Sequence, residues 1–160
     1  MHLSILAIGK MKPGPQAELL KHYLARCDKA GRQLGFKGPK IREWNESGAN
    51  SAEHRKHEEA KLLTGAIQSD SRVICLDERG KDLSSQEFAD ILCNSLENSI
   101  SQLCFAIGGP DGHSKAFRDN CSDVIRFGKM TWPHQLARVM LAEQLYRAIT
   151  ILSGHPYHRA

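Results

Sequence analysis

The chain has 160 residues, of which 41% are hydrophobic, and this is enough to bury the core of one domain, expected over residues 1–160. No apolar run is long enough to span a membrane, and the N-terminal stretch MHLSILAIGK is too short for a secretory signal. The formal net charge is +4, but residues 1–42 carry nine Lys or Arg against two acidic residues, a net +7 that leaves −3 for the remainder. Such a segment suits a phosphate backbone, although an ordinary lysine-rich surface explains it equally well.

The first predicted elements alternate between strands and helices. Residues 3–9 are predicted as a short apolar strand, and in the following helix Leu20, Tyr23, Leu24 and Cys27 share one face. Residues 40–46 are predicted as a second strand. Ser51 can cap a charged helix that runs to about residue 68.

The same alternation continues to the C-terminus. Residues 72–77 form a nearly continuous apolar run, as in strands buried on both faces of a parallel sheet. Ser84 and Glu87 form a capping box, and strands are expected at 103–109 and 123–128. Pro133 suits the first turn of a last helix ending near residue 153. Five strands alternating with helices predict an α/β fold with a mainly parallel sheet.

The last predicted helix carries more apolar surface than one stripe. Packing on a sheet uses one side of a helix, so a wider apolar surface needs a second partner, which is often a copy of the same chain. We therefore predict a homodimer built around this helix. The apolar residues are Leu136, Val139, Met140, Leu141, Leu145, Tyr146, Ala148, Ile149, Ile151 and Leu152.

Three unusual segments follow predicted strands, where open α/β sheets bind ligands: LDERGK, GGPDG and GKMTWPHQ. Gly108, Gly109 and Gly112 allow positive φ angles and a close approach of the backbone to a ligand. The spacing is not that of a dinucleotide-binding motif, and GGPDG alone is more often a turn than a site. Five scattered cysteines without a CxxC pair predict reduced thiols in a cytoplasmic protein rather than disulfides or a zinc site.

Taken with KMTWPHQLARVMLAEQLYRA and HPYHR, these segments give the chain a specific resemblance. Over essentially its whole length it resembles the SPOUT methyltransferases, and most closely the small RlmH family. The resemblance implies a C-terminal trefoil knot, a homodimer, and methylation of N3 of a pseudouridine in 23S rRNA on assembled ribosomes. It also implies S-adenosylmethionine as methyl donor, no metal and no membrane partner.

The family's cofactor site maps onto eight residues of this chain. Apolar side chains and closely approaching glycines suit an adenine, which needs flat walls and backbone groups at its edge. The sequence departs from the family at Asp111, where many relatives carry Glu, and at Gly128, where they often carry Ser. The eight residues are Leu76, Gly108, Phe127, Gly128, Lys129, Met130, Thr131 and Trp132.

The C-terminal tail supplies the candidate catalytic residues. His155 or His158 can accept the N3 proton, Tyr157 can stack on the base, and Arg159 can hold a phosphate or the anionic imide. If a dimer buries the last helix, each tail can reach the cofactor pocket of the other subunit. The alternative is an exposed tail whose polarity has no catalytic role.

Other candidates remain open at this stage. His134 either orients the cofactor loop or is structural, and His54 with His57 is more typical of a solvated face than of a metal site. An ion pair between Glu143 and Arg147 is expected at this helical spacing.

Arg138 and Arg147 are candidate RNA contacts. Two alternative functions are an RNA-associated factor that has lost methyl transfer and a SPOUT enzyme acting on transfer RNA. The glycines and the KMTWPH segment favour a working cofactor site, and the short chain favours the ribosomal substrate.

Overall fold

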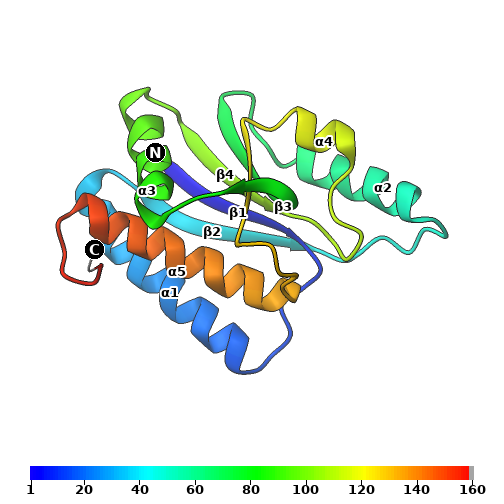
Figure 1. Cartoon of the computed structure of the whole chain (residues 1–160), viewed down its shortest axis with the longest axis horizontal. Helices are drawn as coiled ribbons and strands as arrows, with labels where there is room; N and C mark the ends of the chain where they lie inside the picture. Colours follow the sequence, from blue (N-terminus) through cyan, green and yellow to red (C-terminus); the bar gives the residue numbers. More distant parts are fainter. Residues whose placement is uncertain (159–160) are drawn as a thin grey trace.

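The computed structural model describes residues 1–158 and shows a five-stranded sheet between two layers of helices (Figure 1). The order of the strands is β2-β1-β4-β3-β5, and every pairing is parallel. The predicted α/β fold with a parallel sheet is confirmed. The strands are β1 (His2–Ile8), β2 (Lys37–Trp44), β3 (Ser71–Asp82), β4 (Gln102–Ile107) and β5 (Asp123–Arg126).

Alternating side chains of the buried strands build a separate core on each face of the sheet. In β1, Leu3 and Ile5 pack under α1 (Pro15–Gly31), α3 (Ser85–Glu97) and α5 (His134–Leu152). Leu6 and Ile8 point the other way, toward α2 (Ala52–Thr64) and α4 (Lys115–Asp119). A short 3-10 helix, η1 (Arg32–Leu34), follows α1. Each core strand is therefore covered on both sides, which explains its nearly continuous apolar sequence.

The predicted helix caps are present. Ser51 accepts a hydrogen bond from the N–H of His54, 3.2 Å away, and Ser84 and Glu87 form the complete capping box. Two features differ from the prediction. β3 continues past its apolar half and pairs with β5 again at Lys81 and Asp82, and the five-residue α4 was not predicted.

Most of the apolar surface of α5 is covered within the chain. α1 and α3 pack along α5, and Leu141, Leu145 and Ile149 have no exposed surface. Leu136 in the first turn of α5 is 37% exposed, and Leu19 of α1, at 45%, lines a groove together with Val139 and Met140 of α5. The apolar surface that remains available for a dimer contact therefore lies mainly in the groove between α1 and α5.

Two further expectations concern the whole chain. Within residues 1–158, the helices are too short or too polar to cross a bilayer. The trefoil knot implied by the resemblance is compatible with this strand order and stays a prediction.

Candidate cofactor site

A cavity of about 220 Å³ lies at the carboxyl ends of β3, β4 and β5. Its walls are residues 76–79, 107–112, 126–128 and 130–132, with His134 and Ala137 of α5 at one side. Three segments far apart in the sequence thus meet where open α/β sheets bind ligands. Lys129 is exposed and is not among the lining residues. The other seven predicted cofactor residues line the cavity: Leu76, Gly108, Phe127, Gly128, Met130, Thr131 and Trp132.

The loop after β5 is closed by one hydrogen bond across its base. The indole N–H of Trp132 donates to the carbonyl of Phe127 over 2.8 Å. Gly128 has a φ of 86°, a left-handed conformation that is strained for any residue other than glycine. Met130 is 76% exposed and Trp132 is 41% exposed, so large apolar side chains stand at the mouth of the cavity. Glycine at position 128 fits the backbone geometry that this loop adopts.

The glycines of GGPDG serve two different purposes. Gly112 has a φ of 75° and donates its N–H to the carbonyl of Gly109 over 2.9 Å. The prediction of positive φ is wrong for Gly108 and Gly109. A Cβ on Gly109 would lie 2.7 Å from Oε2 of Glu59, and one on Gly108 would lie 3.1 Å from the backbone of Gly112. These two glycines are required by close packing of the loop rather than by its dihedral angles.

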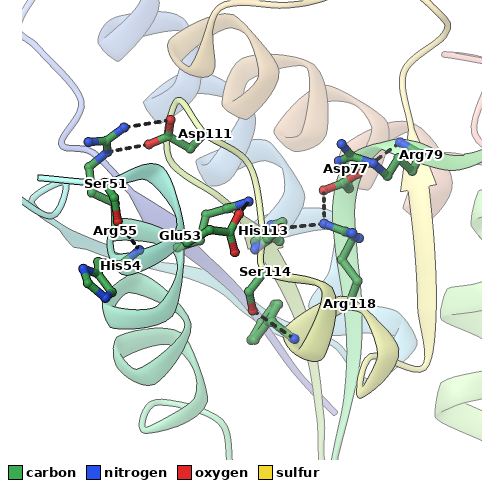
Figure 2. A network of polar contacts seen from close by, with 12 residues as sticks. Ser51, Glu53, His54, Arg55, Asp77, Arg79, Asp111, His113, Ser114 and Arg118 are labelled. Carbon is green, nitrogen blue, oxygen red and sulfur yellow. Dashed lines mark hydrogen bonds and ion pairs between the residues drawn. The ribbon is translucent and has the colours of Figure 1, made fainter. Parts of the chain in front are cut away.

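Figure 2 shows that both walls of the cavity join a network of polar side chains. Arg55 of α2 pairs with Asp111 through two hydrogen bonds of 2.6 and 3.0 Å, and it holds the pKa of that carboxyl below its ordinary value. Arg118 of α4 contacts Asp77 over 3.5 Å and donates to the carbonyl of His113. The network therefore connects the wall formed by β3 and the wall after β4 to α2 and α4.

Asp77 stays ionised although its side chain is only 1% exposed. Burial alone would raise the pKa of this carboxyl. The N–H of Arg79, 3.1 Å away, and the charges of Arg118 and Arg79 outweigh burial and hold the pKa below its ordinary value. Both oxygens of the Asp77 carboxylate are thus bound within the chain, Oδ1 by Arg79 and Oδ2 by Arg118.

Two buried titratable groups beneath the loop were missed by the sequence analysis. His113 stacks on Phe117 with ring centroids 5.0 Å apart, and burial lowers its pKa to about 4, so the imidazole is neutral near pH 7. Glu59 accepts the N–H of Ser47 over 3.0 Å, and burial raises the pKa of its carboxyl. His113 directly follows GGPDG, which is the one sequence signal that could have drawn attention to it.

The C-terminal tail lies at the opposite end of α5 from the cavity. This helix has 19 residues, which corresponds to a length of about 28 Å. The hydroxyl of Tyr157 donates to Glu143 over 3.1 Å, and its ring packs edge-on against Tyr146. His155 is exposed and His158 is half-buried. His155, Tyr157 and His158 therefore do not meet the candidate cofactor pocket of their own chain, and Arg159 lies outside the described residues.

The remaining candidates are now placed. His134 is half-buried at the edge of the cavity, and the ion pair between Glu143 and Arg147 is present. Arg138 is only 1% exposed and pairs with Glu43 over 2.6 Å, so the interpretation of Arg138 as an RNA contact is wrong. Among residues 1–158, His, Cys, Asp and Glu form no group of three suited to a metal ion.

Comparison with known proteins assigns the chain to a class. The family model described as "Predicted SPOUT methyltransferase" matches residues 1–158. A solved structure of a probable methyltransferase from Bordetella pertussis has a TM-score of 0.51 at 12% identity, covering 92% of this chain and 95% of that chain. This likeness supports the fold. The chain belongs to the SPOUT methyltransferases.

Curated relatives narrow the class to one family. A Brucella anthropi protein named ribosomal RNA large subunit methyltransferase H is 48% identical over 160 residues, which is the full length of both chains. A Rhodopseudomonas palustris protein of the same name is 49% identical, also over both full lengths. Within the SPOUT class, this chain is a member of the ribosomal RNA large subunit methyltransferase H family.

Proposed function

We propose that this chain methylates N3 of a pseudouridine in the 23S rRNA of assembled ribosomes, with S-adenosylmethionine as methyl donor. One observation carries the proposal: seven residues assigned to the cofactor from sequence resemblance line a single cavity at the carboxyl edge of the sheet. The cavity is formed in a chain that matches rRNA methyltransferases over its full length. We expect it in the cytoplasm, where bacterial ribosomes are found.

The cavity walls suit this cofactor. Leu76 and Phe127 provide apolar surface for an adenine ring, and the backbone around Gly108 provides donors and acceptors for its edge. Bound S-adenosylmethionine supplies a methyl carbon made electrophilic by the adjacent sulfonium. Methyl transfer forms the N3–carbon bond as the carbon–sulfur bond breaks, and the N3 proton passes to an acceptor. The protein must therefore hold N3 in line with the methyl carbon and assist removal of a weakly acidic proton.

The proton acceptor is best placed on a second copy of the chain. A tail at the far end of α5 does not reach its own cavity, whereas a partner packed on the α1–α5 groove can bring its tail there. Exposed Leu19, together with Val139 and Met140, gives this groove an apolar surface to bury. We propose that His155 or His158 accepts the proton and Arg159 holds a phosphate or the imide anion. Tyr157, already bound to Glu143, anchors the tail.

The first experiment identifies the modified nucleoside. Purified protein is incubated with labelled S-adenosylmethionine and ribosomes that lack the modification, and the rRNA is digested for nucleoside mass spectrometry. We expect one methyl group on N3 of a pseudouridine, and much weaker methylation of a short isolated hairpin. Methyl transfer to transfer RNA alone would favour the alternative enzyme, and cofactor binding without any transfer would favour the RNA-associated factor.

A mixing experiment tests the composite site. A chain with a blocked pocket, Gly108→Val, is co-expressed with a chain carrying His155→Ala and Arg159→Ala. If the tail acts on the partner's pocket, mixed dimers regain activity that neither variant has alone, because one intact pocket faces one intact tail. Activity that stays absent in the mixture, or a chain that sediments as a monomer at micromolar concentration, would contradict the composite site.

Basic residues of the N-terminal quarter provide an RNA-facing surface. All nine Lys and Arg of residues 1–42 are exposed. Among the described residues only one of them, Arg32, forms an ion pair, with Asp28. Other arginines of the chain, such as Arg72 and Arg126, are paired with carboxylates. We propose that the unpaired cations on α1 and the edge strand β2 contact rRNA phosphates.

A further inference from the structure

We propose that Arg55 and Arg118 are positioning residues that hold the two walls of the cofactor pocket at a fixed separation. Neither arginine is among the residues that line the cavity. Each acts through a carboxylate that does line it, Asp111 for Arg55 and Asp77 for Arg118. The inference rests on the proposed function, since it takes this cavity as the S-adenosylmethionine site.

The loop between β4 and α4 needs outside support to keep its position. Within residues 108–112, the backbone is held by the Gly109–Gly112 bridge and its hydrogen bond. These contacts fix a tight turn, but they do not fix where the turn lies relative to β3. Because the wall formed by β3 belongs to a different segment, the width of the cavity depends on side chains that connect the two.

Support from α2 comes through Arg55 and Glu59, which lie one helical turn apart. Arg55 uses Nε and Nη2 for Asp111 (Figure 2). It also donates Nη1 to the carbonyl of Ala49 over 3.0 Å, so the guanidinium is itself fixed in place. Glu59 fills the space directly behind Gly109. The ion pair therefore holds the loop against α2, and steric contact with the buried carboxyl limits how closely the loop can approach that helix.

Support from α4 comes through Arg118 and Phe117. Ser114 caps this short helix by accepting the N–H of Phe117 over 3.2 Å, and the Phe117 ring stacks on His113. The Arg118 guanidinium, whose side chain is 17% exposed, contacts the Asp77 carboxylate and the His113 carbonyl with the same nitrogen (Figure 2). A single group thus connects the end of the β4 loop to the β3 wall.

Removing either arginine has two separable effects. It releases one wall, which weakens binding of any ligand that spans the cavity, and it takes one cation away from a carboxylate there, Asp111 or Asp77. The added negative charge would by itself favour the sulfonium of S-adenosylmethionine over S-adenosylhomocysteine, which lacks this charge. Equal weakening of both ligands therefore identifies loss of geometry as the cause.

The experiment titrates the full-length protein with each ligand by calorimetry. Arg55→Met and Arg118→Met keep most of the apolar side-chain length, and we expect the Kd for both ligands to rise about tenfold. Arg72→Met is the matched control, because Arg72 also pairs with an aspartate, Asp123, over 2.8 Å, but at the amino end of β3. The Kd of the Arg72→Met protein for both ligands is expected to stay within about twofold of that of the unchanged chain, even if its melting temperature falls.

Kinetics and conservative variants separate positioning from a merely structural role. At saturating cofactor the two variants should keep kcat while KM for S-adenosylmethionine rises, and Arg55→Lys and Arg118→Lys should give intermediate values. Combining Arg55→Met with Asp111→Asn should weaken binding no more than Arg55→Met alone, because both break one pair. Unchanged Kd values, or equal losses in Arg72→Met, would overturn the inference. Failure of the unchanged chain to bind either ligand would instead overturn the cofactor assignment and the inference with it.

Discussion

Gly109 and Glu59 are in such close contact that each restricts what the other position can hold. Motif reasoning correctly marks the glycines of GGPDG as points where the backbone comes close to something. It could not show that the neighbour is a buried glutamate of α2 rather than a ligand. Glu59 belongs to no recognisable motif, and it reaches the site only because α2 packs behind the loop.

The close contact predicts a large effect for a small change. In Gly109→Ala the added Cβ would overlap the Glu59 carboxyl, so we expect the free energy of unfolding to fall by about 1–3 kcal/mol. Gly48→Ala is the control, because no atom lies within 4 Å of the Cβ position there. Urea denaturation measures both variants. Equal stability of the two would show that the loop has room to move.

His113 makes stability depend on pH. Its pKa is about 4 in the folded chain and near 6.5 when unfolded, so acidification protonates the unfolded chain first and favours unfolding. Between pH 7 and pH 5 this group should remove about 2 kcal/mol of stability, with full stability recovered above pH 6.5.

His113→Leu isolates the effect, because it removes the titrating group and keeps an apolar side chain against Phe117. Glu59, whose pKa is raised, works in the opposite sense and is present in both proteins. The difference between the two pH profiles from denaturant titrations is therefore the quantity to measure. Parallel profiles would contradict a neutral His113.

At the scale of elements, long regular segments were predictable and short or irregular ones were not. The period of apolar residues located α1, α3 and α5, because each packs on the sheet over several turns. α4 has five residues and only Phe117 is buried, which leaves no period to detect. The second half of β3 is charged, from Asp77 to Asp82, and its renewed pairing with β5 follows from tertiary contacts.

Arg138 shows how α5 is attached to the sheet. It pairs with Glu43 of β2 and donates to the carbonyls of Ile8 and Gly9 over 2.7 Å each. Arg138→Met leaves these acceptors unpaired in the core, so we expect a loss of about 3 kcal/mol in stability.

Adding Glu43→Gln to this variant should restore part of the loss, because the isolated carboxylate is removed. Thermal and urea unfolding give the comparison. A fully stable Arg138→Met protein with weaker ribosome binding would instead restore the RNA-contact interpretation.

At the scale of the molecule, the charge asymmetry of the sequence corresponds to a set of exposed basic side chains in residues 1–42. Six of the nine cations lie on α1 or β2, and β2 is an edge strand of the sheet; Lys10 and Lys12 precede α1, and Arg32 lies in η1. The loops of the cofactor site were likewise predictable, because the ends of parallel strands meet at one edge. Their supports on α2 and α4 were not, since no local pattern connects Arg55 to Asp111 across 56 positions.

The basic surface predicts a salt-dependent affinity for ribosomes. Lys40→Glu and Arg42→Glu should each weaken binding and reduce the slope of log K against log salt concentration by about one. Lys115→Glu is the control, because that exposed lysine on α4 is paired with Asp119. Binding measured by sedimentation at several salt concentrations provides the test. Equal slopes for all three variants would rule out β2 as the docking edge.

The position of these charges on an edge strand has a further consequence for solubility. The outer side of β2 offers unpaired backbone groups to which a second β2 could add, and such additions lead to aggregation. Lys37, Lys40 and Arg42 oppose this, because two copies of the strand would bring like charges together. Replacing all three by glutamate preserves that repulsion whereas apolar replacements remove it, so variants that merely neutralise the edge are expected to precipitate as well as to bind RNA less tightly.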